Sequence, residues 1–363
     1  MSDTQRLLTD TAERVFTDLC TRECAEAAEA GSWPTQLWQA LSETGLTAAA
    51  VSDARGGAGV GLADLCALAR VAGRHAAPVP LVETWLAETL LAAANLPPIE
   101  GPLAAGPVLR RDTLRLERRG GNWTVSGTVK RLPGARHASA LVLTLDADDG
   151  ARTVVVHDAG SRIEAANYAG EPRDDWEFRQ HVIADEWVGA AGSGMGRAEL
   201  FFRGALFRTQ QMAGAMERVL ELTVAYAQER IQFGKAIGKF QAVQQQIAAL
   251  ASQVAAGSAV AQAAAEANSE RLARFEIAAA KARIGEAVAV VAGVAHQVHA
   301  AMGFTHEHSL HRSTRRLWAW RDEFGTESEW QAWVGAVAVQ LGGDALWSYV
   351  VAARKPDIGA ALP

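Results

Sequence analysis

The chain has 363 residues, of which 49% are hydrophobic and 21% are charged, a composition typical of a globular protein with more than one compact region. The formal net charge of -6 argues against a nucleic-acid partner, because phosphate backbones need Lys and Arg concentrated on one face. A small anionic ligand is still compatible with this charge, since a local basic pocket is enough to bind it.

The start of the chain, its apolar segments and its cysteine content predict the cellular compartment and whether the chain spans a membrane. Segment 1–16 carries acidic residues early and has no apolar core, unlike a signal peptide. No apolar run is expected to be long enough to cross a bilayer, because charges interrupt the hydrophobic stretches. Sparse cysteine is usual in a reducing compartment. The sequence therefore predicts a cytoplasmic protein without a membrane span.

No metal site is predicted. The candidate ligands are Cys20, Cys24, Cys66, His306, Glu307, His308 and His311. The cysteines have too few Cys or His neighbours for a zinc site and are better interpreted as small buried apolar residues. The histidines lack the spacing of a His-Glu-x-x-His zinc motif, which favours loop and helix-start roles for them.

The hydrophobic pattern divides the chain into regions that follow one another. Residues 1–96 have apolar stripes at helical spacing around a Gly-rich turn at 53–59 and predict an N-terminal helical domain. Residues 97–190 alternate apolar and polar positions between turn signals and predict an antiparallel sheet or a small antiparallel β-barrel, since a βαβ fold needs helices between its strands. Residues 191–363 hold the longest periodic segments and predict an antiparallel four-helix bundle. The expected class is mainly α with a central β domain.

The most specific motif occupies residues 226–248 in the third region. One helix is expected to end near Phe233-Gly234 and the next to begin by Phe240. The tight connection is expected to carry Arg230, Gln232, Lys235 and Gln241. An arginine and amide side chains at a helix end can clamp a phosphate or an adenine. A solvated turn between two helices is the alternative interpretation.

This segment resembles the helix-turn-helix pattern of the acyl-CoA dehydrogenase family, in which tyrosine and arginine are followed by Gln-Phe-Gly and then Phe-Gln. Weaker similarities at Gly56-Gly57, at 73–78 and at 125–127 extend the resemblance over nearly the whole chain. It implies an FAD-dependent α,β-dehydrogenation of an acyl-CoA thioester, as in the β-oxidation of lipids. Such a reaction needs a carboxylate in an apolar pocket to take the α-proton, while the flavin accepts the β-hydride.

The resemblance also implies which residues contact FAD, a cofactor that members of this family bind between subunits. The residues at these positions are Arg230, Gln232, Phe233, Gln241, Gln297, Ala300, Ala301 and Thr326. Arg230 lies on the loop that reaches the FAD of a neighbouring subunit in the family. Ala300 and Ala301 replace two glycines of the Gln-x-x-Gly-Gly pattern, and their methyl groups are expected to restrict the approach of the cofactor.

Neither position of the family's catalytic base carries an acid. The base of many members is a Glu directly before Gly-Thr, and that of others lies on the helix before the arginine loop; these positions fall on Phe324 and Gly204. Glu323 is the remaining candidate, although a shift of one helical position rotates a side chain by ~100°. The alternative is that Glu323 forms an ion pair with a nearby arginine such as Arg321.

The strand that faces the flavin in this family is altered as well. Its Trp-x-Thr pattern falls on Arg131 and Pro133, and Gly106-Pro107 is the remaining similarity to the family's Thr-Glu-Pro-Gly loop. The departures leave several functional interpretations open, which differ in how much of the family's chemistry this chain performs.

The first interpretation is an active dehydrogenase with bound FAD and Glu323 as an unusual base. The second is a catalytically degenerate subunit that completes the FAD site of a heteromeric acyl-CoA dehydrogenase, as in bacterial relatives that act on bulky acyl chains. The missing base and the altered flavin strand favour this second interpretation. The third is a CoA-binding protein without redox activity. The resemblance implies a homo- or hetero-oligomer, and an electron acceptor such as an electron-transfer flavoprotein.

Overall fold

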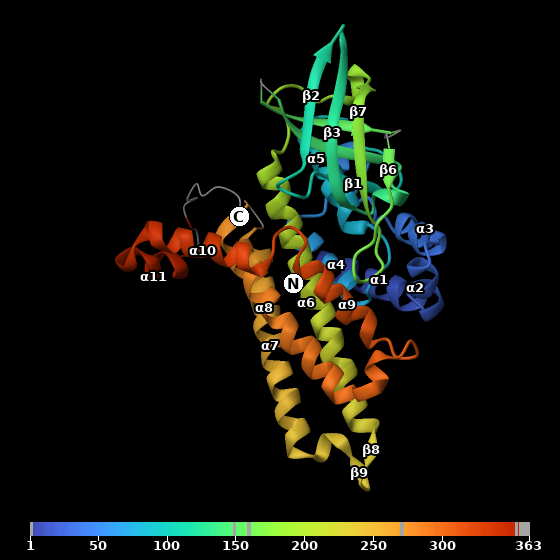
Figure 1. Cartoon of the computed structure of the whole chain (residues 1–363), viewed down its shortest axis with the longest axis vertical. Helices are drawn as coiled ribbons and strands as arrows, with labels where there is room; N and C mark the ends of the chain where they lie inside the picture. The colour runs from blue at the N-terminus through green and yellow to red at the C-terminus, as the bar shows by residue number, and fades with distance from the viewer. Residues whose placement is uncertain (1–2, 148–149, 158–160, 269–271, 353–354, 356–363) are drawn as a thin grey trace. The chain divides into compact units, whose positions relative to one another are not determined.

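The structure is a computed structural model that describes residues 3–147, 150–157, 161–268, 272–352 and 355. Helices dominate the described part of the chain, and the longer strands are confined to its middle (Figure 1), as predicted. The chain forms two compact units. Unit 1 contains the residues up to Leu65 together with Pro78–Gly204, and unit 2 contains Cys66–Ala77 together with the residues from Ala205 onward. The N-terminal helices therefore share a unit with the strands.

One helix of unit 1, α5 (Leu81–Ala93), is buried and packs on strands of the same unit. The other helices that lie within this unit are α1 (Asp3–Leu19), α2 (Arg22–Glu29), α3 (Thr35–Glu43), η1 (Asp53–Arg55), η2 (Ala135–His137) and η3 (Asp185–Trp187). α5 is buried on nearly every side, and its Trp85 donates the indole N–H to the carbonyl of Leu46 at 2.9 Å. Thr84 accepts a hydrogen bond from the N–H of Leu103 at 3.1 Å, so α5 fixes the start of the first strand.

The strands form two sheets, so of the predicted antiparallel sheet or small barrel, no closed barrel is present among the described residues. One sheet has the order β1 (Leu103–Gly106), β4 (Ala140–Ala147), β5 (Gly150–Val156). The other has the order β2 (Thr113–Arg119), β3 (Asn122–Pro133), β7 (Arg173–Ile183), β6 (Ser161–Ile163). Among the described residues no strand closes either sheet, and β1 pairs with β4 in parallel. The β2–β3 hairpin between them is a crossover long enough to permit parallel pairing, which alternation alone does not reveal.

Unit 2 is helical. Beyond the start of α6 (Arg197–Glu229) it contains β8 (Ile231–Gln232), β9 (Lys235–Ala236), η4 (Ile237–Lys239), α7 (Gln241–Ala267), α8 (Arg274–His299), η5 (Ala300–Phe304), α9 (Leu310–Arg321), α10 (Glu327–Leu341) and α11 (Gly343–Val351). α7 and α8 lie side by side over most of their length (Figure 1), and α10 also packs on α8.

The unit 2 part of α4 (Leu62–Arg74) crosses α6 at two glycines. A Cβ atom added to Gly214 would lie 1.9 Å from the carbonyl oxygen of Arg70, and one added to Gly73 would lie 2.1 Å from that of Gln211. Only glycine permits the two backbones to approach so closely. The ion pairs beside the glycines are Arg70–Glu217 and Arg74–Glu221.

Two helices of unit 2 contradict the expectation that no apolar run is long enough for a bilayer. Gln241–Ala267 and Arg274–Phe304 are long and apolar enough to cross a membrane by length and composition, and α10 with α11 would be a third span with a bend of 119°. Residues 241–265 carry no charged side chain, so the argument from interrupting charges was wrong there. The absence of a membrane span stays a prediction.

Candidate functional site

The arginine loop forms a two-stranded hairpin between α6 and α7. Arg230 is fixed at its root, because its N–H donates to the carbonyl of Tyr226 at 2.9 Å and its carbonyl accepts from Ile237 at 2.8 Å. Gln232 pairs with Lys235 across the hairpin. α6 therefore ends at Glu229 and not near Phe233, and the structure brings Arg230 and Gln232 together on one exposed element.

Phe233 occupies the turn of this hairpin and points away from the chain's own core. It is 92% exposed, with a left-handed φ of 51°. Its ring contacts Phe240 edge to face at 6.2 Å, and the Lys235 ammonium lies 4.3 Å from the centre of the Phe240 ring. The aromatic and basic side chains of the loop therefore contact one another and stabilise its conformation. Because Phe233 is exposed, the loop can contact a molecule outside this chain.

The end of α8 carries the second predicted cofactor segment. Gln297, Ala300 and Ala301 are all exposed. Ala300 has φ 50° and ψ -139°, a conformation that glycine adopts readily and alanine only under strain. The backbone therefore has the geometry that the family's glycine would give, although a methyl group is present.

Ala300→Gly is expected to raise the free energy of unfolding by about 1 kcal/mol, because it relieves this strain. Ala301 has no positive φ, so Ala301→Gly should lower that free energy by about 0.5–1 kcal/mol through added chain entropy. Urea unfolding of the two variants gives the comparison. If both variants change the free energy of unfolding by the same amount in the same direction, the backbone at Ala300 is not strained.

A cluster of aromatic rings joins the root of the hairpin to the end of α8. The ring of Tyr226 stacks on that of His299 at 4.5 Å, and the ring of His308 lies 4.7 Å from His299. His296 shares a hydrogen bond of 2.9 Å between Nε2 and the hydroxyl of Thr314. Burial lowers the pKa of His296, His299 and His308. The two predicted cofactor segments are therefore neighbours, linked by rings that the sequence pattern did not connect.

Stability is expected to fall as the pH drops from 7 to 5. A histidine with a lowered pKa binds fewer protons when folded than when unfolded, so it favours the folded state above its ordinary pKa of about 6.5 and loses this advantage below it. His299→Phe, which keeps a ring against Tyr226, should reduce the loss of melting temperature over this range. His306→Phe, at an exposed position, should leave it unchanged. An identical pH profile for wild type and His299→Phe would contradict this account.

Thr326 begins α10 as its N-cap. Its hydroxyl accepts a hydrogen bond from the N–H of Glu329 at 3.3 Å, and the Glu329 carboxylate accepts from the N–H of Thr326 at 2.8 Å. This reciprocal capping box engages the side chain of Thr326 in fixing the helix start. Its assignment as a cofactor contact stays a prediction.

Glu323 lies against α6. Its carboxylate accepts a hydrogen bond from Nε of Arg208 at 2.7 Å, and the side chains of Arg208 and Glu323 are 2% and 10% exposed. The guanidinium also lies 5.6 Å from the ring centre of Trp320. The ion pair expected as the alternative role of Glu323 is present with a different partner, since Arg321 pairs with Glu327. Sequence reasoning missed Arg208, whose sole signal is a charge within an apolar stretch of α6.

The two positions of the family's base lie in buried surroundings. Phe324 is 3% exposed with a φ of 52°, and its carbonyl accepts the indole N–H of Trp330 at 3.0 Å. Gly204 is buried within α6. Neither residue can take a proton from a substrate, so no acid replaces the base at these positions.

Lys281 forms hydrogen bonds with the backbone of the segment that contains Phe324. Its ammonium donates to the carbonyls of Arg321 and Gly325, at 2.8 and 2.9 Å. It is fully buried, and this burial lowers the pKa of Lys281 to about 7. The carbonyl oxygens supply the polar partners that a buried amine needs. The segment from Arg321 to Gly325 is thereby held in one conformation from α8.

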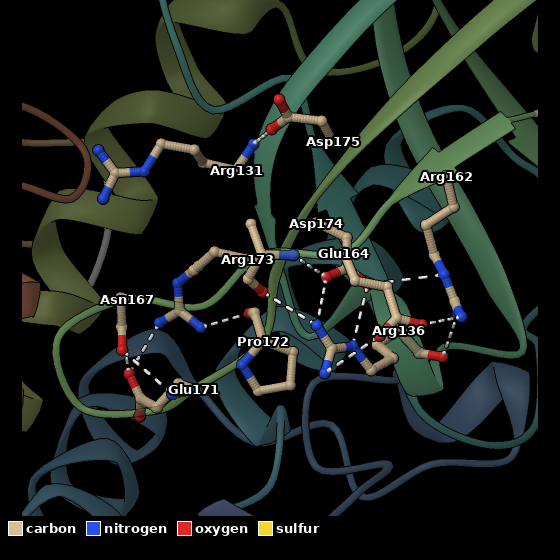
Figure 2. A network of polar contacts seen from close by, with 11 residues as sticks. Arg131, Arg136, Arg162, Glu164, Asn167, Glu171, Pro172, Arg173, Asp174 and Asp175 are labelled. Atoms are coloured by element: carbon tan, nitrogen blue, oxygen red, sulfur yellow. Dashed lines mark hydrogen bonds and ion pairs between the residues drawn. The ribbon is translucent and has the colours of Figure 1, made fainter. Parts of the chain in front are cut away.

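The strand position that the sequence predicts to match the flavin-facing one of the family carries an exposed arginine in unit 1. Arg131 has φ 53°, and its N–H donates to the carboxylate of Asp175 at 2.8 Å. Figure 2 shows its guanidinium pointing away from the network around Asp174. Pro133, two positions on, has no N–H to donate.

The residues therefore fit FAD in one part of the chain and not in the other. The hairpin and the α8 end present an arginine, amides and glycine-like backbone geometry in unit 2. In unit 1, Arg131 and Pro133 provide neither the indole nor the hydroxyl of the family pattern.

Comparisons with known proteins match two parts of the chain to domains of one family. Residues 2–95 match the acyl-CoA dehydrogenase N-terminal domain, and residues 192–332 match the C-terminal domain. An acyl-CoA dehydrogenase of Mycobacterium tuberculosis, IpdE2, is 30% identical over 295 residues, which are 80% of this chain and 83% of that protein. The chain belongs to the acyl-CoA dehydrogenase family. Members of this family are FAD flavoproteins.

Further members of the family have similar sequences or folds. The IpdE2 of Mycolicibacterium smegmatis is 29% identical over 321 residues, covering 85% of this chain and 91% of that one. The ChsE4-ChsE5 complex of Mycobacterium tuberculosis superposes with a TM-score of 0.84 at 21% identity, covering 94% of this chain and 99% of that one. The Tcur3481-Tcur3483 steroid acyl-CoA dehydrogenase gives 0.81 at 24% identity, covering 93% and 98%. These structural matches show the fold of the acyl-CoA dehydrogenases.

Proposed function

We propose that this chain is the base-lacking subunit of a heteromeric FAD-dependent acyl-CoA dehydrogenase, in which it completes the cofactor site of a partner that carries the base. The ion pair between Arg208 and Glu323 carries the proposal, because it engages the nearest acid while Phe324 and Gly204 occupy the family's base positions. The overall reaction is the α,β-dehydrogenation of an acyl-CoA thioester.

Glu323 is a poor proton acceptor for physical reasons. Accepting a proton would break its ion pair and leave the charge of the Arg208 guanidinium, whose side chain is 2% exposed, without the carboxylate that balances it. An α-proton acceptor instead needs a carboxylate in an apolar pocket that opens toward the thioester. The base must therefore come from another family member.

This chain contributes groups that point outward. Arg230, Phe233 and Gln297 are exposed on the hairpin and at the end of α8. An arginine can bind phosphoryl oxygens in a bidentate manner, and an amide can donate to or accept from a ring system. When bound, FAD supplies the hydride acceptor of the reaction. The cofactor held by these groups would belong mainly to the partner, since Arg131 and Pro133 replace the flavin-facing pattern here.

Names of proteins with the same fold support the heteromeric assembly and a bulky acyl group. Two of the solved structures are named for pairs of chains, and one of these is named a steroid acyl-CoA dehydrogenase. We propose an acyl-CoA with a large apolar acyl group as the substrate, and an electron-transfer flavoprotein as the acceptor of its electrons.

Flavin content tests the proposal. The chain is purified alone, and then after co-expression with a family member that has Glu directly before Gly-Thr. We expect a colourless lone protein and a complex that retains flavin and is bleached by acyl-CoA. Stoichiometric flavin in the lone protein, bleached by an acyl-CoA without any partner, would refute the proposal and establish a self-sufficient dehydrogenase.

Arg230→Ala is expected to weaken flavin retention by the complex about 10- to 100-fold, the usual effect of losing one charged hydrogen bond. Arg218→Ala is the matched control, because Arg218 lies on α6, the helix before the hairpin, and pairs at the surface with Glu221 at 3.4 Å. Flavin titration of the two complexes measures the difference. Equal flavin affinities of the two variant complexes would show that Arg230 does not contact the cofactor.

A further inference from the structure

The loop of residues 305–309 joins η5 to α9 in unit 2, and one of its histidines holds the start of that helix. Nδ1 of His308 accepts a hydrogen bond of 3.1 Å from the N–H of Leu310, the first residue of α9. Ser309 precedes Leu310 as the N-cap but makes no side-chain hydrogen bond to the helix start. The His308 ring therefore pairs with one of the N–H groups that the first turn of a helix leaves without a partner.

This hydrogen bond requires an uncharged imidazole. Both nitrogens of a charged imidazole carry a hydrogen, so Nδ1 of a protonated His308 cannot accept from Leu310. The new positive charge would also lie at the N-terminus of α9, where the helix dipole disfavours a cation. Protonation of His308 thus removes an attractive contact and adds a repulsive one at the same place.

A second histidine holds the same loop in a way that does not depend on its charge. Nδ1 of His311 donates to the carbonyl of His308 at 2.8 Å. A ring nitrogen that carries a hydrogen can donate this bond in a neutral or in a charged imidazole. The sensitivity of the loop to protonation therefore lies in His308 and not in His311.

The His308 ring packs against other rings. Its centre lies 4.7 Å from that of His299 and 6.1 Å from that of Tyr226. His299 is fully buried, and its Nδ1 donates to the carbonyl of Ala295 at 2.8 Å, so a further proton on this ring would have to go to Nε2. A positive charge on either histidine would lose part of its hydration among these rings.

The charges that surround His308 disfavour a further positive charge. The groups that act on the two stacked imidazoles are cations or become cations when protonated: Arg218 on α6, His296 and His299 on α8, His308 in the loop and His311 on α9. Of the nearby acids, Glu221 pairs with Arg218 at 3.4 Å, and Glu307 is exposed on the loop itself.

The direction of the pH dependence follows from these surroundings. Burial, and then the charges of His311, Arg218 and His296, lower the pKa of His308. The closed loop therefore binds fewer protons than an opened one, in which the histidine regains its ordinary pKa of about 6.5. The closed state has its full stability above this value and loses it as the pH falls below it.

We propose that His308 is a pH-sensitive switch, whose neutral ring holds residues 305–309 and the first turn of α9 closed and whose protonation releases them. The released ring also leaves Tyr226, and the carbonyl of Tyr226 accepts from the N–H of Arg230. The switch thus connects the pH to the root of the arginine hairpin. It does not rest on the proposed function, because it opens and closes in the chain alone, without flavin or a partner subunit.

Hydrogen–deuterium exchange of the whole chain at pH 7.5 and pH 5.5 tests the switch, after correction for the intrinsic exchange rate at each pH. We expect the protection of residues 303–312 to fall about fivefold or more between the two values. α7 should remain better protected than this segment at both, because the opening is local. Equal protection of α7 and the segment at pH 5.5 would show global unfolding and overturn the proposal.

His308→Asn separates the switch from a merely structural role. The Asn side-chain oxygen can accept from Leu310 as Nδ1 does, but it does not titrate. This variant should keep the protection at pH 7.5 and lose most of the fall at pH 5.5. His306→Asn, at an exposed position of the same loop, is the matched control and should keep the whole fall. The same fall in wild type and His308→Asn, or no fall in wild type, would refute the switch.

Discussion

Arg208→Ala is expected to lower the free energy of unfolding of unit 2 by about 3–5 kcal/mol, because it leaves the Glu323 carboxylate without its buried cation. The pair is joined at 2.7 Å with side-chain exposures of 2% and 10%, so water can replace little of the lost interaction. The guanidinium also contacts Trp320, and alanine removes that packing as well. Urea unfolding followed by tryptophan fluorescence measures the change.

Arg203→Ala provides the comparison on the same helix. Arg203 pairs with Glu199 at 2.8 Å, but their side chains are 22% and 37% exposed, and such pairs contribute about 0–1 kcal/mol. Arg208→Met combined with Glu323→Leu should recover much of the stability lost in Arg208→Ala, since the unpaired charge is gone. If Arg208→Ala unfolds at the same urea concentration as Arg203→Ala, the ion pair is not the buried contact described.

The second large effect is expected at the crossing of α4 and α6. Gly214→Val should lower the free energy of unfolding by about 3 kcal/mol or more, because overpacking forces backbone shifts. Even a single Cβ atom at Gly214 would meet the Arg70 carbonyl oxygen at 1.9 Å. The helices would have to separate, and the ion pairs beside the crossing would be disturbed with them.

Gly293 is the matched control for this substitution. It lies exposed in α8, and a Cβ atom there meets nothing within 4 Å. Gly293→Ala should therefore stabilise the protein by about 0.5–1 kcal/mol through helix propensity. Gly214→Ala makes the same chemical change inside the crossing, so its destabilisation separates the clash from propensity. A stabilised Gly214→Ala variant would contradict the close approach of the helices.

Much of the fold could be predicted from the sequence because local patterns determine it. The helical spacing on both sides of residues 97–190, and the alternation within them, indicate the order of elements. The arginine loop was found because Arg230 and Gln232 lie only two positions apart in the chain. Strand pairing could not be predicted in the same way: β1 and β4 are distant in sequence, and nothing in their alternation specifies a parallel pair.

The sequence was enough to predict that the family's catalytic base is missing from the candidate site. It was not enough to predict which residues contact one another there. The sequence shows that Phe324 stands where a Glu is expected. It does not show that Glu323 points to Arg208, because that ion pair joins α6 to a distant segment. Lys281 was missed for a similar reason, since its partners are backbone carbonyls, which leave no trace in residue type. The glycine-like geometry of Ala300 was equally hidden, because alanine rarely adopts it.

We propose that this chain holds a cofactor together with its partner but does not take the proton. The most direct measurement is the rate at which acyl-CoA bleaches the flavin of the complex when this chain carries Glu323→Gln. The glutamine oxygen can still accept from Arg208, so the fold and flavin content should be retained. The account predicts a rate within about twofold of wild type, whereas a fall of roughly 100-fold or more with flavin still bound would identify Glu323 as the base and contradict it.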